Sequence, residues 1–172
     1  MGLLKIFFLL VLLCSNLVQA QLLPDNGVLS VQSVQRWMDS NRDFAPLVQM
    51  LDGIYSSELE MQGFERLPAA EQDQKINQFL LQNNKLDIAR KVAAERGWKS
   101  VGEYMRLSSR LGNAIAAYFL LDSLQKVTEE QKKALREKAD PAILAVSASD
   151  IAFVKANEKL LQQYIQAYSQ GQ

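Results

Sequence analysis

The sequence predicts an all-α protein, a single compact domain of six or seven helices in an irregular or orthogonal bundle. Apolar residues recur at helical spacing along nearly the whole chain, and no stretch alternates in the manner of a half-buried strand. Helix caps and prolines interrupt this pattern at short intervals, and no internal repeat is visible. The uneven helix lengths that follow argue against a simple up-and-down four-helix bundle.

Residues 1–20 have the features of a secretory signal peptide. Lys5 supplies the positive start, residues 6–14 form an unbroken apolar run, and Val18-Gln19-Ala20 offers a signal-peptidase site. The apolar run is shorter than the roughly 20 residues that a membrane-spanning helix needs. We therefore expect cleavage near Ala20, a periplasmic or secreted mature protein, and no transmembrane anchor.

The composition of the mature chain excludes several classes of function. Removal of residues 1–20 leaves 152 of the 172 residues and no cysteine, because Cys14 leaves with the leader, and the chain has no histidine. We therefore expect no metal site, no cofactor and no histidine-assisted nucleophile. The 19 basic and 19 acidic residues of the whole chain balance, so charge does not favour nucleic acid as a partner. The lack of disulfides and of Asn-x-Ser/Thr sequons fits a bacterial periplasmic protein most simply.

The helical domain is expected over residues 30–172, after a lead-in over residues 21–29 that we expect to be flexible. Ser30 is the expected cap of the first helix, a break is expected over 41–43, and Asp43 is the expected cap of the second helix. The inner faces of these two helices are expected to be formed by Val31, Val34, Trp37, Met38, Phe44, Leu47, Val48, Leu51, Ile54 and Tyr55.

Two further helices are expected before the middle of the chain. Residues 62–68 are expected to form a connection, and Pro68 suits the start of the third helix. Asparagines at 83–84 interrupt the pattern before the fourth helix, for which Gly97 is the expected C-terminal cap. The inner faces of this pair are expected to be formed by Ile76, Phe79, Leu80, Leu86, Ile88, Ala89, Val92 and Ala93.

A long central helix is expected over about residues 100–125. Ser100 and Glu103 form a capping-box pattern at its start. Its apolar face is expected to consist of Val101, Tyr104, Met105, Ser108, Leu111, Gly112, Ile115, Tyr118 and Phe119. Small residues four apart on this helix let another backbone come close, which predicts a core contact along them. This small-residue seam consists of Ser108, Gly112 and Ala116.

The C-terminal part of the chain is expected to hold a surface helix and a last apolar helix. Thr128 and Gln131 form a second capping box before a highly charged segment over 129–140, and Pro141 is expected to end it. Glu/Lys pairs would hold this surface helix. The last helix is expected to begin at Ser147 or Ser149 and to bury Ile151, Val154, Leu161, Tyr164, Ile165 and Tyr168.

The segment Val127-Thr128-Glu129-Glu130-Gln131 resembles the Leu-Thr-x-x-Gln element of small periplasmic stress chaperones of the Spy and CpxP type. The similarity covers five residues, departs at Val127 and occurs once, where that family carries two copies. The mature chain is close to neutral, whereas those chaperones present a basic concave surface. The resemblance implies a holdase-like envelope stress protein with an exposed apolar face, which is our alternative function.

The candidate ligand-binding residues are Trp98, Tyr104, Arg106 and Arg110. The two arginines lie four apart on the flank of the central helix, and Trp98 precedes that helix. An aromatic ring beside an arginine pair can cradle an anionic or aromatic ligand. In the simpler interpretation, which we favour, Glu95 and Glu103 neutralise the arginines and Trp98 packs as a lid on the core.

Catalysis by carboxylates gives a third, less favoured function, a hydrolase. The adjacent acid pairs are Glu58 with Glu60, Glu71 with Asp73, and Glu129 with Glu130. Residues one or two apart on a helix do not face each other, so a hydrolase needs two acids from different helices in one cleft. A Lys99/Ser100 nucleophile is a formal alternative, but Ser100 already serves as a helix cap.

We therefore expect an exported, non-enzymatic helical protein that binds another molecule. The expected partner is an envelope protein or a small apolar or anionic ligand held between helices. The sequence also allows a homodimer. Aromatic residues near helix ends are typical of pocket rims and contact patches. These aromatic residues are Trp37, Phe64, Trp98, Tyr164 and Tyr168.

Overall fold

The computed structural model describes residues 29–170, which form helices and short connections without a strand. The all-α prediction is therefore confirmed, but this part of the chain holds nine α-helices and one 3-10 turn rather than six or seven helices. The elements are α1 (Val31–Leu51), the 3-10 turn (Asp52–Ile54), α2 (Glu58–Glu65), α3 (Ala69–Gln82), α4 (Leu86–Glu95), α5 (Val101–Gln125), α6 (Glu129–Lys138), α7 (Pro141–Leu144), α8 (Ala148–Ala156) and α9 (Glu158–Gln170). The predicted signal peptide, its cleavage site and residues 21–28 of the expected flexible lead-in lie outside the described residues, as does the side chain of Tyr168. Between residues 29 and 170, no helix combines the length and apolarity needed to cross a membrane.

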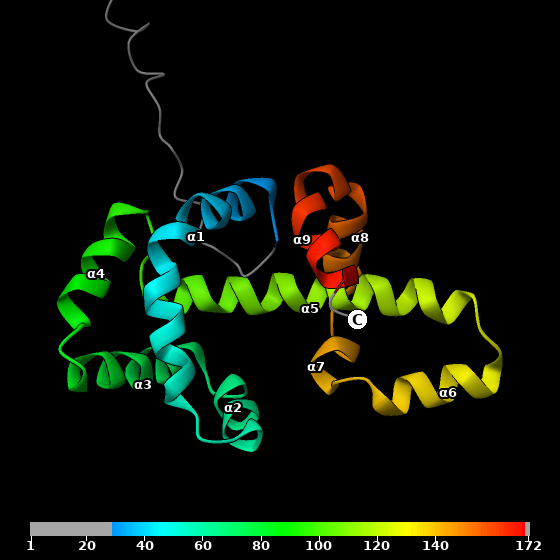
Figure 1. Cartoon of the computed structure of the whole chain (residues 1–172), viewed down its shortest axis with the longest axis horizontal. Coiled ribbons are helices and arrows are strands. Elements are labelled where there is room, and N and C mark those ends of the chain that lie inside the picture. The colour runs from blue at the N-terminus through cyan, green and yellow to red at the C-terminus, as the bar shows by residue number, and fades with distance from the viewer. Residues whose placement is uncertain (1–28, 171–172) are drawn as a thin grey trace, which may run out of the picture.

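The long central helix is α5, around which the other helices are arranged (Figure 1). α1, α3 and α4 gather about its N-terminal half, α8 and α9 lie on one side of its C-terminal half, and α6 and α7 return along the other. The Ser100 hydroxyl accepts a hydrogen bond from the Glu103 backbone N–H at 3.0 Å, so the predicted cap is present. α5 thus connects both halves of the molecule.

The predicted break over residues 41–43 is wrong, because α1 continues through it to Leu51. Asn41 is engaged by two tyrosines from other helices, and its side chain does not compete for the local backbone. Asp43 forms an ion pair with Arg96 instead of capping a new helix. Figure 1 shows that α1 changes direction along its length, as expected of a helix with Pro46 in its interior. The polar segment therefore marks a bend and not an end.

Two other boundaries differ from those that we expected. Residues 62–65 belong to α2, whose N-terminus is capped by the Ser57 hydroxyl. The last apolar helix is divided into α8 and α9 at Asn157, whose side chain donates to the Phe153 carbonyl at 2.8 Å. Pro141 begins the short helix α7 after the end of α6. Each of these helix boundaries is set by a polar cap or a proline, whose effect on the backbone extends over only a few residues.

Local signals elsewhere agree with the structure. Gly97 and Asn84 adopt positive φ angles of 72° and 54° at the ends of α4 and α3, a conformation in which glycine and asparagine are favoured. Thr128 and Gln131 form both hydrogen bonds of a capping box at the start of α6. No side chain of α6 is buried, as the charged pattern predicts.

The core centres on an aromatic cluster formed by Trp37, Phe44, Trp98, Tyr104 and Tyr164. Phe44 stacks on Tyr104 with ring centroids 3.9 Å apart, and Trp98 meets Tyr104 edge-on at 5.4 Å. Trp37 lies 4.9 Å from Tyr164, which joins α9 to α1. Val31 and Ile88 were expected on the inner faces of their helices, but this prediction is wrong, because they are 44% and 56% exposed. Both lie in the first turn of a helix, at the edge of the apolar face.

Candidate functional site

Trp98 and Tyr104, two of the four candidate ligand-binding residues, lie in the core. Trp98 is 3% exposed, and its Nε1 donates to the Ser40 hydroxyl at 2.9 Å. The Arg36 guanidinium lies 4.0 Å over the centre of the Trp98 ring, a cation–π contact. The Tyr104 hydroxyl donates to Asn41 Oδ1 at 2.6 Å. Both rings therefore serve packing, and neither lines the two clefts described below.

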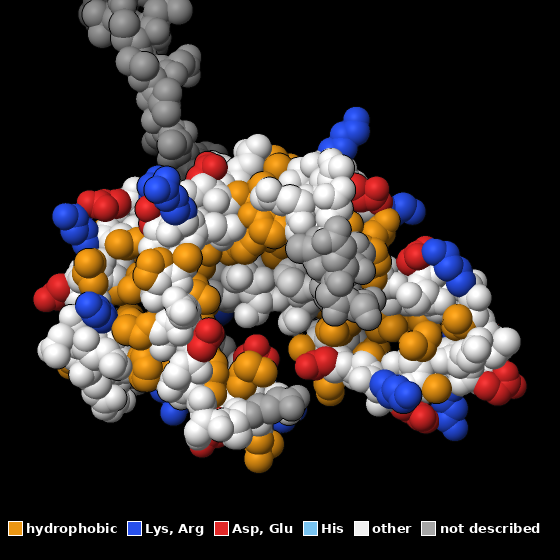
Figure 2. Space-filling model, viewed as in Figure 1, with side chains coloured by type: hydrophobic (Ala, Val, Ile, Leu, Met, Phe, Trp, Pro, Cys, Tyr) orange, Lys and Arg blue, Asp and Glu red, His pale blue; other side chains and the backbone are white. Residues whose placement is uncertain are grey.

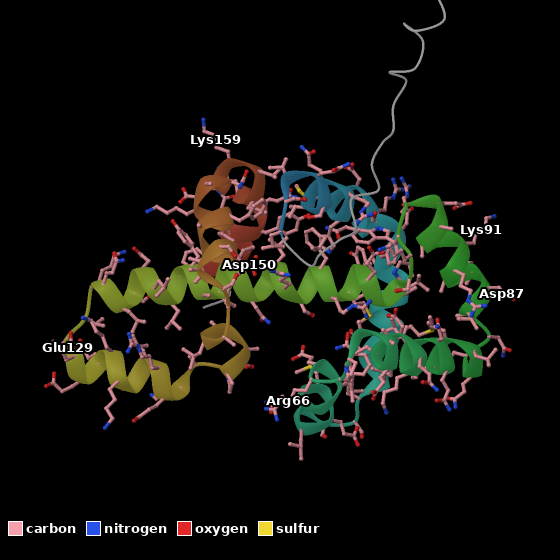
Figure 3. The ribbon with its side chains drawn as sticks, turned by 180° about the vertical axis from the view of Figure 1, so that it is seen from behind. Arg66, Asp87, Lys91, Glu129, Asp150 and Lys159 are labelled. Carbon is pink, nitrogen blue, oxygen red and sulfur yellow. The ribbon has the colours of Figure 1, made fainter. Side chains whose placement is uncertain are left out.

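Arg106 and Arg110 lie on another flank of α5, where carboxylates from other helices neutralise both. Arg106 Nη1 donates to Asp73 Oδ1 at 2.8 Å, from α3. Arg110 binds Asp150 of α8 through two hydrogen bonds, Nε to Oδ2 at 2.9 Å and Nη2 to Oδ1 at 3.0 Å. Figure 3 shows Asp150 where α8 meets α5. The arginines are thus paired before any ligand arrives.

The acids that neutralise these arginines differ from those that the sequence suggested. Glu103 contacts Arg36 at 3.8 Å, and Glu95 contacts Lys91 at 3.9 Å. The expected partners, Glu95 and Glu103, are near the arginines in sequence, whereas the observed ones are 33 and 40 residues away. Charge spacing along one helix therefore could not identify them.

A cleft of about 490 Å³ lies beside this arginine pair, between α2 and α3 on one bank and α7 and α8 on the other. Figure 2 shows the molecule hollowed between these two parts. Its apolar lining includes Phe64, Ile76, Met105 and Val146. Polar atoms come from Gln72, Ser109 and Asn113 in addition to the arginines. The lining thus offers both apolar surface and hydrogen-bonding groups.

A second cleft of about 400 Å³ shares Arg106 and Arg110 with the first and continues toward Lys99 and Glu103. We call the two together the α5 trough. Because an α-helix rises about 1.5 Å per residue, the lining from Glu103 to Asn113 extends over about 15 Å. The α5 trough is therefore elongated along α5.

Two groups with raised pKa values, Glu65 and Tyr55, line the α2–α7 end of the α5 trough. Burial and the nearby Asp140 carboxylate raise the pKa of Glu65 above its usual value. Burial and the charges of Glu65 and Asp52 raise the pKa of Tyr55. Both arginines are already paired with aspartates, so an anionic ligand would have to compete for them.

In each adjacent acid pair considered for catalysis, one member is already held by a hydrogen bond or an ion pair. Glu60 accepts hydrogen bonds from Ser56, and the pKa of Glu60 is lowered by them. Asp73 binds Arg106, and Glu129 binds Lys132. Among the side chains of the described part of the chain, no group of three or more His, Cys, Asp or Glu residues could hold a metal ion.

Gly102 is the residue that allows the Asp73–Arg106 pair to lie against α5. A Cβ atom at Gly102 would stand 1.9 Å from Asp73 Oδ1, so the carboxylate would have to leave. Gly102→Ala is expected to lower the free energy of unfolding by about 1 kcal/mol, because lost charged hydrogen bonds of about 2 kcal/mol outweigh a helix-propensity gain of about 1 kcal/mol. Urea unfolding measures this change.

Gly112→Ala, on the same helix, is the matched control for Gly102→Ala. A Cβ at Gly112 would meet no atom within 4 Å, so this variant should be more stable than the parent by about 0.5–1 kcal/mol. In an Asp73→Ala background, Gly102→Ala should no longer lower the free energy of unfolding. If Gly102→Ala still lowered the free energy of unfolding in that background, the Asp73 carboxylate would not be the cause of the destabilisation.

Comparison with protein-family models, with curated protein sequences and with solved structures finds no match for this chain. Sequence reasoning named Arg106 and Arg110 as candidate ligand-binding residues and favoured their neutralisation by acids, but it missed the aspartates that bind them and the opposite bank formed by α7 and α8. Only the folded arrangement brings these residues together.

Proposed function

We propose that this protein is an exported, non-enzymatic interaction protein that binds an extended segment of another polypeptide in the α5 trough. The observation that carries the proposal is that two clefts along α5 share one arginine pair in their linings. A trough of about 15 Å accommodates about four residues of extended chain, at about 3.3 Å each. A compact small ligand would occupy only part of that length.

The chemistry of the α5 trough supports a polypeptide segment over a free anion. A peptide offers N–H and C=O groups along its length, and Ser109, Asn113 and the free N–H groups of the arginines can bind them. Phe64, Met105 and others supply apolar surface for its side chains. Free anions would compete with Asp73 and Asp150 for guanidinium groups that are already bound.

Export is part of the proposal and rests on the signal-peptide pattern of residues 1–20. The expected mature protein begins at Gln21 and works in the periplasm or outside the cell. Its partner is then another envelope or secreted protein.

Native mass spectrometry of the protein purified gently from the periplasm of its source cells tests both export and the binding of a polypeptide. We expect the mass of residues 21–172 together with a polypeptide adduct. Ser109→Trp, which fills the α5 trough from an exposed position, should remove the adduct. Ser123→Trp, at an exposed position of the same helix outside the trough, should keep it.

Each contrary result of this measurement has a separate meaning. A protein that retains residues 1–20 would contradict export. A bare mature mass would contradict tight binding, and equal loss of the adduct in both tryptophan variants would contradict the location. An adduct of a few hundred daltons would indicate a small ligand in place of a polypeptide.

A holdase-like chaperone is the alternative function, and exposed apolar side chains favour it. Leu59 is 79% exposed and Leu81 is 62% exposed, on α2 and α3. A chaperone of this kind needs such residues to form one continuous surface. Weak uptake of a fluorescent apolar dye by the folded protein would count against it.

A carboxylate-dependent hydrolase is the third function. Glu65 and Asp140 come from different elements, and the pKa of Glu65 is raised, which is the pattern that acid–base chemistry requires. However, Asp140 Oδ1 already accepts the Ala142 backbone N–H at 2.7 Å as a helix cap. We therefore prefer binding to hydrolysis.

A further inference from the structure

The α2–α7 end of the α5 trough has acidic groups on both of its sides. Glu65 of α2 lines the trough and is exposed to solvent. Asp140, which precedes α7, is close enough for its charge to raise the pKa of Glu65. Figure 2 shows acidic side chains on both sides of the hollow between α2 and α7. Negative charge is therefore concentrated at this end of the trough.

Neither of these two carboxylates has a cation as its partner among the described residues. The Glu65 carboxylate forms no ion pair or hydrogen bond, not even with its sequence neighbour Arg66. Asp140 Oδ1 accepts a backbone N–H at 2.7 Å as a helix cap but forms no ion pair. By contrast, Asp73 and Asp150 each bind an arginine. The α2–α7 end is therefore the part of the trough at which negative charge is left unbalanced.

Gln72 of α3 supplies an uncharged acceptor beside these acids. Its side chain is 7% exposed, and its Nε2 donates to the backbone carbonyls of Glu65 at 3.1 Å and Leu67 at 2.9 Å. Because carbonyl oxygens only accept, the nitrogen must face them, so Gln72 Oε1 is directed away from the α2–α3 connection. This oxygen has no donor among the described residues, yet it is not sealed off from solvent in the trough that Gln72 lines. An amide held in this orientation with its acceptor unused points to a donor from a ligand.

The surroundings of these acceptors suit a donor on an apolar stem. Phe64 and Ile76 line the same cleft, and the Tyr55 ring meets Phe64 edge-on at 5.2 Å. The Tyr55 hydroxyl adds a further acceptor. Lysine combines a flexible four-carbon stem with an ammonium group that carries three N–H donors. A metal ion suits the site less, because no group of three or more His, Cys, Asp or Glu residues between residues 29 and 170 could hold one.

We propose that the polypeptide segment bound in the α5 trough carries a lysine side chain, whose ammonium group binds the Glu65 carboxylate and Gln72 Oε1. This inference rests on the proposed function, because it names the side chain by which the bound segment is recognised. The lysine stem lies against Phe64, and the charge of Asp140 adds to the attraction. Both arginines of the trough are neutralised by aspartates, so they do not oppose a second cation.

A titration with blocked amino acids tests the lysine directly. The probe is N-acetyl-lysine methylamide, and its control is N-acetyl-norleucine methylamide, whose side chain is the same stem without the ammonium group. The side-chain amide signals of Gln72 in the ¹⁵N-labelled mature protein report binding at this end of the trough. The lysine compound should shift these signals and bind about fivefold more tightly than the norleucine compound.

Three charge-removing variants locate the ammonium group. Glu65→Gln should weaken binding of the lysine compound about fivefold and leave binding of the norleucine compound unchanged. Asp140→Asn should weaken it by a smaller factor, since asparagine keeps the helix cap and removes only a distant charge. Glu71→Gln is the matched control, because Glu71 is an exposed acid of α3 that does not line the trough. It should change neither affinity.

Three results would overturn the inference. They are unmoved Gln72 signals at the highest concentration of the lysine compound, equal binding of the two compounds, and equal weakening by Glu71→Gln and Glu65→Gln. If any of them occurred while Ser109→Trp still removed a polypeptide adduct, the proposed function would stand and the lysine would not. Binding of the lysine compound by a protein that carries no adduct would contradict the proposed function and leave the ammonium site in place.

Discussion

Replacement of Phe44 by alanine is expected to lower the free energy of unfolding by about 3–5 kcal/mol, the largest effect that we predict for one substitution. Phe44 is fully buried, stacks on Tyr104 at 3.9 Å and meets Trp98 edge-on at 6.4 Å. The substitution removes the apolar contacts of the ring and leaves a cavity among rigid neighbours that can close only in part.

Equilibrium unfolding in urea, followed by far-UV circular dichroism, measures the effect of Phe44→Ala. Leu59→Ala is the control, because a side chain that is 79% exposed should contribute no more than about 0.5 kcal/mol. If Phe44→Ala lowered the free energy of unfolding by less than about 1 kcal/mol, the aromatic cluster would not be a main source of core stability. The slope of unfolding free energy against urea should stay the same in both variants.

Alkaline pH should destabilise the protein through Tyr104. Burial, together with the charge of Tyr164, raises the pKa of Tyr104 from 10.0 to about 12. Below pH 10 the phenol is neutral in both folded and unfolded chains, so its contribution to stability is complete. Between pH 10 and 12 the unfolded chain loses the proton first, and about 2–3 kcal/mol of stability is lost.

Comparison of the parent with Tyr104→Phe isolates this pH effect. Phenylalanine keeps the ring but has no proton to lose, so the parent should lose more stability than the variant between pH 9.5 and about 12. The pKa values of Tyr55 and Tyr118 are also raised, and both residues contribute equally to the two proteins. If the free energy of unfolding fell equally with pH in the parent and the variant over this range, the loss of stability could not be assigned to Tyr104.

Features of the fold that depend on a few neighbouring residues could be predicted from the sequence. The Ser100 and Thr128 caps and the positive φ of Gly97 act within one turn of chain, and all three are present. The expected break in α1 failed because Asn41 finds its partners in Tyr104 and Tyr164, far along the chain. Tertiary hydrogen bonds thus turned a helix-breaking segment into part of a helix.

The candidate site could be predicted only where its residues share one helix. Arg106 and Arg110 were recognisable from their spacing on α5, but their charge state depends on Asp73 and Asp150 from α3 and α8. Trp98, a candidate binding residue for which we favoured packing as a lid on the core, is buried and donates its Nε1–H to Ser40. Pairings of this kind depend on how helices pack, which periodicity does not specify.

The weak attachment of α2 bears on how this protein can change during evolution. Among residues 59–65 of α2 no side chain is buried, although Phe64 and Glu65 form part of the trough wall. Apart from those at Phe64, which packs against the core, substitutions at 59–65 therefore cost the core little, while they alter the surface that a bound segment meets. Like the variable loops on a rigid scaffold, this helix can adapt to new partners while α5 keeps the fold constant.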